Sequence, residues 1–235
     1  MGWKTSLIII ENPKNLRDDQ AILKAIDSAD FKFDRELTLD DCLYPKDGSI
    51  SIGYYNGNII ISDDYQITND SLDRAKTLEL TKQEKGLTTL FPASGIVSVA
   101  CHSVVNYHAY SLIEKGQKVR LKTISSDNPI KEFGQRTPEE NAIYTSSFQK
   151  DGKTYWKDET DPDDHYTEDQ LMEQFTFEFA KRRLGVMIDH SEGDELREVT
   201  FKKYKKRKTS KWLKYGLIVL AFVAWQILKR TVLRD

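Results

Sequence analysis

Cysteine and histidine are scarce in this sequence, and the glycine-rich loops that hold phosphate groups are missing. Its 235 residues include two cysteines and four histidines. Cys42 and Cys101 lack the C-x-x-C spacing of metal and redox sites, and we expect both to be reduced thiols. The strand–turn–helix pattern near the N-terminus lacks the glycines of a phosphate-binding loop. We therefore expect no metal and no cofactor.

Charge is divided unevenly along the chain. The formal net charge is only −2, yet residues 201–235 contain 11 Lys and Arg residues and a single acid, Asp235. The first 200 residues therefore hold 24 of the 35 basic residues and 36 of the 37 acidic residues. An acidic domain repels the phosphate backbone of DNA and RNA, so no nucleic-acid partner is expected.

The longest apolar run lies near the C-terminus, at residues 212–228. Its 17 residues are close to the shortest helix that spans a bilayer. Leu217–Ala224 is apolar on every face, whereas a helix lying on the membrane surface needs a polar stripe. A core helix of the soluble domain is the other alternative, but basic residues crowd both ends of the run. We expect one transmembrane helix at 212–230, followed by a short tail at 231–235.

Basic and aromatic residues flank this run, as they flank transmembrane helices. Eight basic residues precede or border it and three follow it, so the domain should lie on the cytoplasmic side by the positive-inside tendency. The basic run at 202–208 should attract anionic lipid headgroups. The residues expected at the membrane interface are Lys205, Lys206, Arg207, Lys208, Trp212, Lys214, Trp225, Lys229 and Arg230.

The rest of the chain is expected to form one soluble α+β domain at 1–190, joined to the membrane helix by a polar and basic linker at 191–211. The domain should contain a largely antiparallel sheet and about three helices. Its clearest element is a hairpin that turns at Asn56-Gly57, a dipeptide typical of type I′ turns.

Hydrophobic periodicity predicts further elements. A helix is expected at 69–84. β-branched and aromatic residues favour one long strand at Gly95–Ile113. The next strand, at 118–124, alternates so that Arg120 and Lys122 should face water.

Nucleophilic and basic side chains gather in one cluster of eight positions. Alternation along a strand places Cys101 and Ser103 on one face, and His102, Asn106 and His108 on the other. Adjacent residues therefore cannot form a Cys–His or Ser–His pair without a bulge or a partner from elsewhere. The three residues on the second face could line a polar pocket, although the two histidines lie about 20 Å apart on a straight strand, too far to share a metal. A sheet with hydrogen-bonded polar positions is the plainer interpretation.

Four short motifs in this sequence are similar to motifs of a known protein family. They are Met1-Gly-x-Lys4-Thr5, His102-Ser-Val-Val-Asn-Tyr-x-Ala109, Gly116-x-x-Val-Arg120 and Ile130-x-x-Phe-Gly134. Together they resemble an uncharacterised bacterial family of unknown function, over about residues 1–188. The resemblance implies an α+β domain and brings no activity, and it draws attention to Lys4, His102 and Ser103.

Hypotheses from different functional classes remain open. The first is a membrane-tethered, non-enzymatic module that binds a protein partner or a small ligand. Its candidate ligand-binding residues are Lys4, His102, Asn106 and His108. The second is a membrane-associated, hydrolase-like enzyme, favoured by a pocket that holds a candidate residue beside a carboxylate from another element. Its candidate catalytic residues are His102, Ser103 and Cys101. A bacterial stress or defence effector that acts through its membrane segment is a third.

Overall fold

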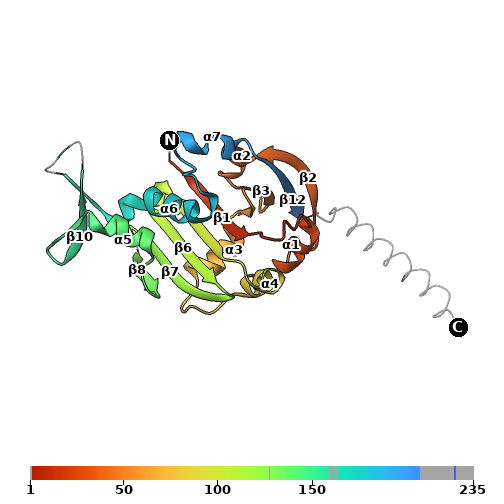
Figure 1. The fold of residues 1–235 in the computed structure, drawn as a ribbon, viewed down its shortest axis with the longest axis horizontal. Coiled ribbons are helices and arrows are strands. Elements are labelled where there is room, and N and C mark those ends of the chain that lie inside the picture. Colours follow the sequence, from red (N-terminus) through yellow and green to blue (C-terminus); the bar gives the residue numbers. More distant parts are fainter. Residues whose placement is uncertain (1, 127, 159–160, 162–163, 207–224, 226–235) are drawn as a thin grey trace. The chain divides into compact units, whose positions relative to one another are not determined.

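The computed structural model describes residues 2–126, 128–158, 161, 164–206 and 225. Contacts divide the chain into two units, Met1–Lys205 and Lys206–Asp235. The first unit is an α+β domain built on a large, largely antiparallel sheet, as expected (Figure 1). The described residues contain seven α-helices instead of about three, because several are single turns too short to leave a periodic pattern.

The main sheet has nine strands in the order β2-β12-β3-β4-β1-β5-β6-β7-β8. These strands are β1 (Lys4–Glu11), β2 (Phe31–Thr38), β3 (Ile50–Tyr55), β4 (Asn58–Asp63), β5 (Ile96–His102), β6 (Tyr107–Glu114), β7 (Gln117–Ser125), β8 (Asn128–Phe133) and β12 (Thr200–Lys206). A second sheet of three strands lies beyond α5 in Figure 1. It contains β9 (Ser147–Lys150), β10 (Lys153–Lys157) and β11 (His165–Thr167).

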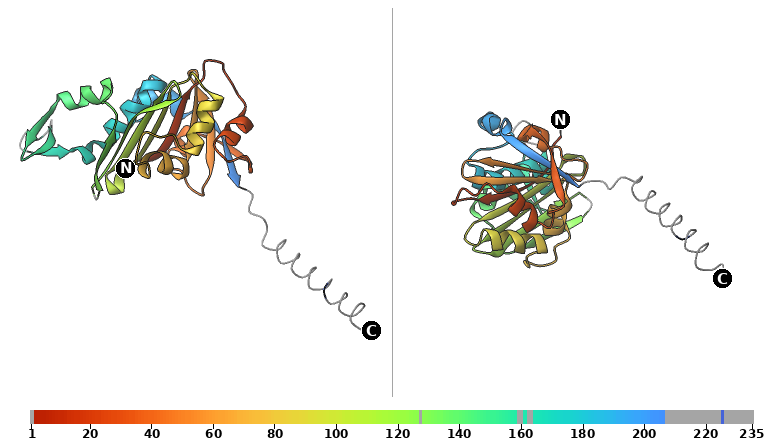
Figure 2. Two further views of the ribbon diagram at one scale, coloured as in Figure 1. Left: turned by 90° about the horizontal axis from the view of Figure 1, so that it is seen from below. Right: turned by 90° about the vertical axis from the view of Figure 1, so that its right-hand side faces the viewer.

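Helices lie on both sides of the main sheet (Figure 2). One side, the α6 face, is covered by α2 (Leu39–Cys42), α5 (Pro138–Thr145), α6 (Met172–Leu184) and α7 (Asp194–Arg197). The opposite side, the α4 face, is covered by α1 (Asp19–Ala25), α3 (Gln66–Thr68), α4 (Lys82–Leu90) and a π-helix (Asn69–Asp73).

The central strand β1 shows why both faces are buried. Leu7 and Ile9 join the core under α6, while Ile8 and Ile10 join the core under α1 and α4. All four are at most 2% exposed. Burial of each such side chain contributes about 1.5–3 kcal/mol relative to exposure. A continuous apolar run is therefore the pattern of a strand covered on both sides.

Turn chemistry was the most reliable guide to the elements. The hairpin of β3 and β4 is confirmed, with Asn56 and Gly57 at positive φ values of 45° and 71°. The helix expected at 69–84 is wrong. The π-helix ends at Asp73, and α4 begins only after Thr81, whose hydroxyl and backbone N–H exchange hydrogen bonds with Glu84.

The single strand expected at Gly95–Ile113 is also wrong. A 3-10 turn at Ser103–Val105 separates β5 from β6, and the two strands then pair as a hairpin. Asn106 adopts a left-handed conformation, with φ 44°, and so supplies the reversal without glycine or proline. The turn places His102 and His108 on opposite faces of the sheet, which corrects the shared face expected for them.

The folded domain extends beyond the boundary expected from the sequence. Residues 200–206, expected in the linker at 191–211, form β12, which pairs with β3. Phe201 is fully buried and anchors this strand to the sheet core. Lys205 lies 3.2 Å from Asp34 in an ion pair. The basic run is therefore partly a strand and not entirely a linker.

The expected membrane segment falls almost wholly outside the described residues. Of its interfacial residues, the described ones are Lys205, Lys206 and Trp225, the last being 60% exposed. Those outside are Arg207, Lys208, Trp212, Lys214, Lys229 and Arg230. Among the described residues, no helix is both long and apolar enough to cross a bilayer.

Candidate functional site

Two of the three candidate catalytic residues lie on the α6 face. Cys101 is fully buried, and burial raises the pKa of its thiol to about 12. Ser103 accepts a hydrogen bond from the backbone N–H of Trp3 at 2.6 Å and lies within hydrogen-bond distance of Glu173. These contacts tie the hydroxyl to the N-terminal segment and to α6. The Cys101 thiol is therefore not a nucleophile near neutral pH, and the Ser103 hydroxyl is held by its hydrogen bonds.

The strand register places Cys101 opposite His108, but the two do not form a catalytic pair. Neither ring nitrogen of His108 has a hydrogen-bond partner in the part of the chain that the structure describes. Burial, together with the nearby Lys122, lowers the pKa of His108 well below its usual range, so the ring is neutral. It stacks against Phe175 with ring centroids 5.4 Å apart. His108 is therefore packed in the core under α6.

His102 and Lys4 lie together on the α4 face, directly opposite each other in the β1–β5 register. They open onto a pocket of about 390 Å³ at the ends of the strands. We call it the Lys4 pocket. Its lining residues are Lys4, Tyr65, Asn69, Asp73, His102, Val105, Tyr107 and Ser125. Asn106, the remaining candidate, does not line it and instead donates a hydrogen bond to Asp169 at 3.2 Å.

The Lys4 pocket contains two buried polar atoms without partners. Neither His102 Nδ1 nor Tyr107 Oη has a hydrogen-bond partner among the described residues. Burial raises the pKa of Tyr107, so its phenol stays protonated and can donate. Lys4 Nζ lies 5.6 Å from the centre of the Tyr65 ring, and Tyr65 Oη donates to the Cys101 carbonyl at 2.6 Å. A buried polar group without a partner costs stability, so these two atoms on pocket-lining residues require an explanation.

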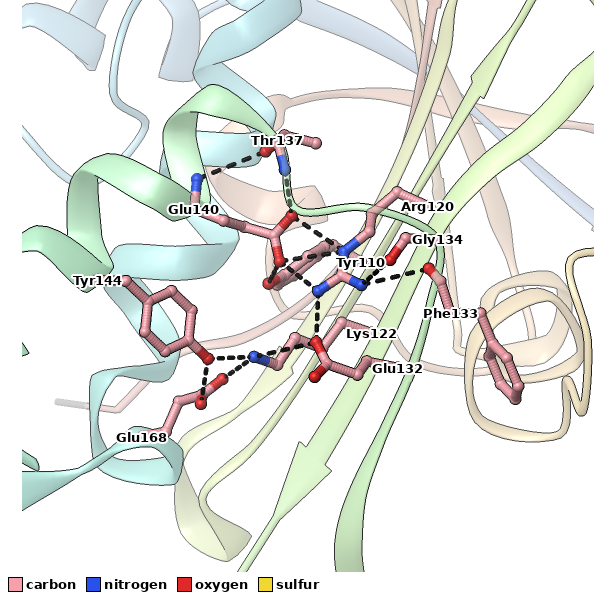
Figure 3. Close-up of polar contacts among 10 residues, drawn as sticks. All are labelled: Tyr110, Arg120, Lys122, Glu132, Phe133, Gly134, Thr137, Glu140, Tyr144 and Glu168. Atoms are coloured by element: carbon pink, nitrogen blue, oxygen red, sulfur yellow. Dashed lines mark hydrogen bonds and ion pairs between the residues drawn. The ribbon is translucent and has the colours of Figure 1, made fainter. Parts of the chain in front are cut away.

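Sequence reasoning missed a second polar assembly, the buried ion network of Figure 3. Arg120 and Lys122 were expected to face water, yet they are 1% and 0% exposed. They lie on the α6 face beneath α5 and α6. The expectation failed because strand alternation says which residues share a face but not whether that face is covered.

Arg120 is fully compensated by its neighbours. Its Nε lies 3.0 Å from Glu140 Oε2, and its Nη2 lies 2.7 Å from Glu132 Oε2. Its Nη1 donates to the carbonyls of Phe133 and Gly134, at 3.3 and 2.9 Å. The guanidinium thus donates hydrogen bonds to β8, to the loop after it and to α5.

Glu140 and Lys122 extend the network. The capping box of α5 orients Glu140, because its carboxylate accepts the Thr137 backbone N–H at 2.8 Å. Lys122 forms an ion pair with Glu168 and donates to Tyr144. The T-x-x-E pattern of the capping box was visible in the sequence, but its link to Arg120 was not. With its charges paired, this network holds helices on the sheet.

Fold and pocket together define an α+β domain with an open pocket at the strand ends, lined by charged, polar and aromatic residues. The chain belongs to the DUF6928 family, a family of unknown function, which matches residues 18–198. This confirms the expected kinship with an uncharacterised family. The Met1-Gly-x-Lys4-Thr5 motif precedes the matched residues. No curated protein and no solved structure matches the chain.

Proposed function

We propose that this chain is a membrane-tethered binding module whose α+β domain binds a small ligand in the Lys4 pocket. The observation that carries the proposal is the pair of buried, unpartnered atoms, His102 Nδ1 and Tyr107 Oη, in a pocket that also holds the Lys4 ammonium group. The burial of Cys101, and the hydrogen bonds that Ser103 makes with Trp3 and Glu173, support binding over catalysis.

The lining residues indicate the chemistry of the ligand. Lys4 supplies a positive charge and Tyr107 a hydroxyl donor, and both favour an acidic or strongly accepting group. His102 adds a ring nitrogen that can accept or donate according to its tautomer. The ligand is therefore a small molecule with an acidic group, held by a charge and by two hydrogen bonds.

Ligand-observed NMR with the full-length chain tests this proposal. The probes are small carboxylates, phosphate esters and neutral amides. We expect acidic probes to bind, and Lys4→Met and Tyr107→Phe each to weaken binding about tenfold or more, because hydrogen bonds to charged groups contribute about 1.5–3 kcal/mol. Lys76→Met, at an exposed site outside the pocket, is the control. Binding that is unchanged in both pocket variants would refute the proposal.

The tether is proposed on the apolar run at 212–228 and its basic flanks, with the domain on the cytoplasmic side. Carbonate extraction and protease protection of full-length membranes test it. The matched soluble variant must end after Lys206, because β12 belongs to the folded domain. We expect the full-length protein to resist carbonate and the shortened protein to be soluble. Release of the full-length protein by carbonate would contradict the tether.

One observation keeps the hydrolase alternative in view. Asp73, from the π-helix, lines the same pocket as His102. Such an enzyme would use His102 to activate water, since Cys101 and Ser103 are on the other face. Turnover of nitrophenyl esters that is lost in His102→Gln and in Asp73→Asn would establish it in place of simple binding.

A further inference from the structure

Lys203 on β12 differs from every other buried cation of the described residues. Four cationic side chains are buried there: Lys118, Arg120, Lys122 and Lys203. The first three each form an ion pair with a buried glutamate. Lys203, only 5% exposed, makes no ion pair and no hydrogen bond with the described residues. Buried lysines are rare unless paired, so this one requires an explanation.

The Lys203 side chain lines a pocket of about 380 Å³ on the α6 face, which we call the Lys203 pocket. In the strand register Lys203 lies opposite Ser51 of β3, and Ser51 lies opposite Ser62 of β4. Because residues directly opposite each other in paired strands point to the same face, these three residues form a polar row across three strands. Ser62 Oγ donates to the Cys42 carbonyl, which fixes α2 over the end of this row. The pocket therefore has a polar floor with a cation in it.

The neighbouring acids do not neutralise Lys203. Asp34 and Asp47 pair instead with Lys205, at 3.2 and 3.8 Å. Three further acids line the pocket from exposed positions, and none forms an ion pair with Lys203: Glu36, Asp40 and Asp41. Burial, followed by the charges of Lys205 and Arg35, lowers the pKa of Lys203. Asp47 and Asp34 act in the opposite direction but do not outweigh the burial, so an anion beside the ammonium group would stabilise its charge.

The Cys42 thiol, which also lines this pocket, is not a candidate nucleophile. Burial raises its pKa to about 12, so the thiolate that would act as a nucleophile does not form near neutral pH.

We propose that the Lys203 pocket binds a small oxyanion, a carboxylate or phosphate group, with Lys203 as its counter-ion and Ser51 as a hydrogen-bond partner. Arg35, which lines the same pocket from β2 at an exposed position, adds a second cation. The volume exceeds that of one phosphate and is within the range of small-molecule sites. This site lies on the opposite face of the sheet from the Lys4 pocket, and the proposal does not depend on the function proposed for that pocket.

Calorimetric titration of the full-length chain with inorganic phosphate and with malonate tests the proposal, with sodium chloride at matched ionic strength as the blank. We expect one site that binds at least one of the two probes. Lys203→Met should weaken this binding tenfold or more, and Ser51→Ala by about three- to tenfold. Lys202→Met is the matched control, because Lys202 is the exposed neighbour on the same strand.

Each outcome decides the proposal. Binding of phosphate alone assigns a phosphorylated ligand, and binding of malonate alone assigns a carboxylate ligand. If Lys203→Met does not fold, Ser51→Ala carries the test. The proposal is overturned if neither probe binds the wild-type chain, or if binding survives unchanged in the folded pocket variants. It is also overturned if Lys4→Met abolishes the binding, because the anion site is then the Lys4 pocket.

Discussion

Strands β7 and β12 both bury cations on the α6 face of the sheet, but the cations on β7 have ion-pair partners, whereas Lys203 on β12 has none among the described residues. Arg120 and Lys122 on β7 are surrounded by three glutamates, Glu132, Glu140 and Glu168. Lys203 on β12 faces a cavity and serine hydroxyls. The desolvation of a charge costs several kcal/mol per ion, which an ion pair of good geometry offsets and a cavity does not. The difference separates charges that hold the fold together from a charge that is left for a ligand.

The Lys4 pocket resembles the Lys203 pocket on β12, because each is lined by a residue with a polar group that has no partner among the described residues. Its Tyr107 hydroxyl has no hydrogen-bond partner among the described residues, whereas the Tyr110 hydroxyl, three residues along the same strand, donates to Glu140 at 2.8 Å. One strand thus supplies a compensated hydroxyl to the network and an uncompensated one to the pocket.

The largest predicted effect on stability comes from removing a carboxylate from the buried ion network of β7. Glu140→Gln should lower the free energy of unfolding by about 3–5 kcal/mol, because it removes one partner of a buried ion pair and leaves Arg120 undercompensated. Urea unfolding of the full-length chain measures this. Glu139→Gln is the control, since Glu139 pairs with the partly exposed Arg182. We expect that substitution to cost about 1 kcal/mol or less. Equal losses in both variants would show that the network does not stabilise the fold.

The two tyrosines of β6 sharpen the comparison. Tyr110→Phe should cost about 1.5–3 kcal/mol, because it removes a hydrogen bond to a charged group. Tyr107→Phe should change the free energy of unfolding by less than about 0.5 kcal/mol, because it removes a hydroxyl without a partner. Parallel urea titrations measure both. A loss at Tyr107 as large as that at Tyr110 would mean that the pocket hydroxyl is already satisfied within the domain.

The smallest predicted effect concerns pH. His108 stays neutral in the folded chain, because its pKa is lowered from 6.5. Below pH about 6.5 the unfolded chain therefore binds a proton that the folded chain does not, and stability falls as the pH falls. Between pH 6.5 and 5.5 this contribution amounts to about 1 kcal/mol.

His108→Phe removes that contribution. The stability of the variant relative to the wild type should rise by about 1 kcal/mol over the same pH range, as measured by urea unfolding at each pH. His190→Gln, at a site with the side chain 62% exposed, serves as the control. A constant difference between wild type and His108→Phe across this range would show that His108 takes up its proton in the folded state.

Local chemistry predicted the elements whose signals are local. The Asn56-Gly57 turn is confirmed, because its residues tolerate the conformation that the hairpin needs. The reversal at Ser103–Val105 was missed, because Asn106 supplies a left-handed residue inside an otherwise β-rich run. The burial of Arg120 could not be predicted, since it depends on α5 and α6, which lie at least 18 residues further along the chain.

The candidate sites likewise contain some residues that the sequence could single out and others that only the fold brings to the site. Lys4 and His102 could be singled out from sequence, but their pocket partners Tyr65 and Tyr107 come from other elements. Lys203 was hidden in the basic run at 202–208, where it looked like one of several lipid-facing charges. Only the register of β12 separates it from the exposed Lys202.

One measurement tests the central contrast most directly: the free energies of unfolding of Lys118→Met and Lys203→Met, compared side by side in chloride buffer without other anions. Lys118 Nζ lies 2.8 Å from Glu84, and both side chains are buried. Lys118→Met should therefore cost about 3–5 kcal/mol. Lys203→Met should leave stability unchanged or raise it, because it removes the charge of a buried side chain that has no ion-pair partner within the described residues. If Lys203→Met destabilises the chain as much as Lys118→Met, Lys203 is already compensated within the fold, and the contrast between the two strands is wrong.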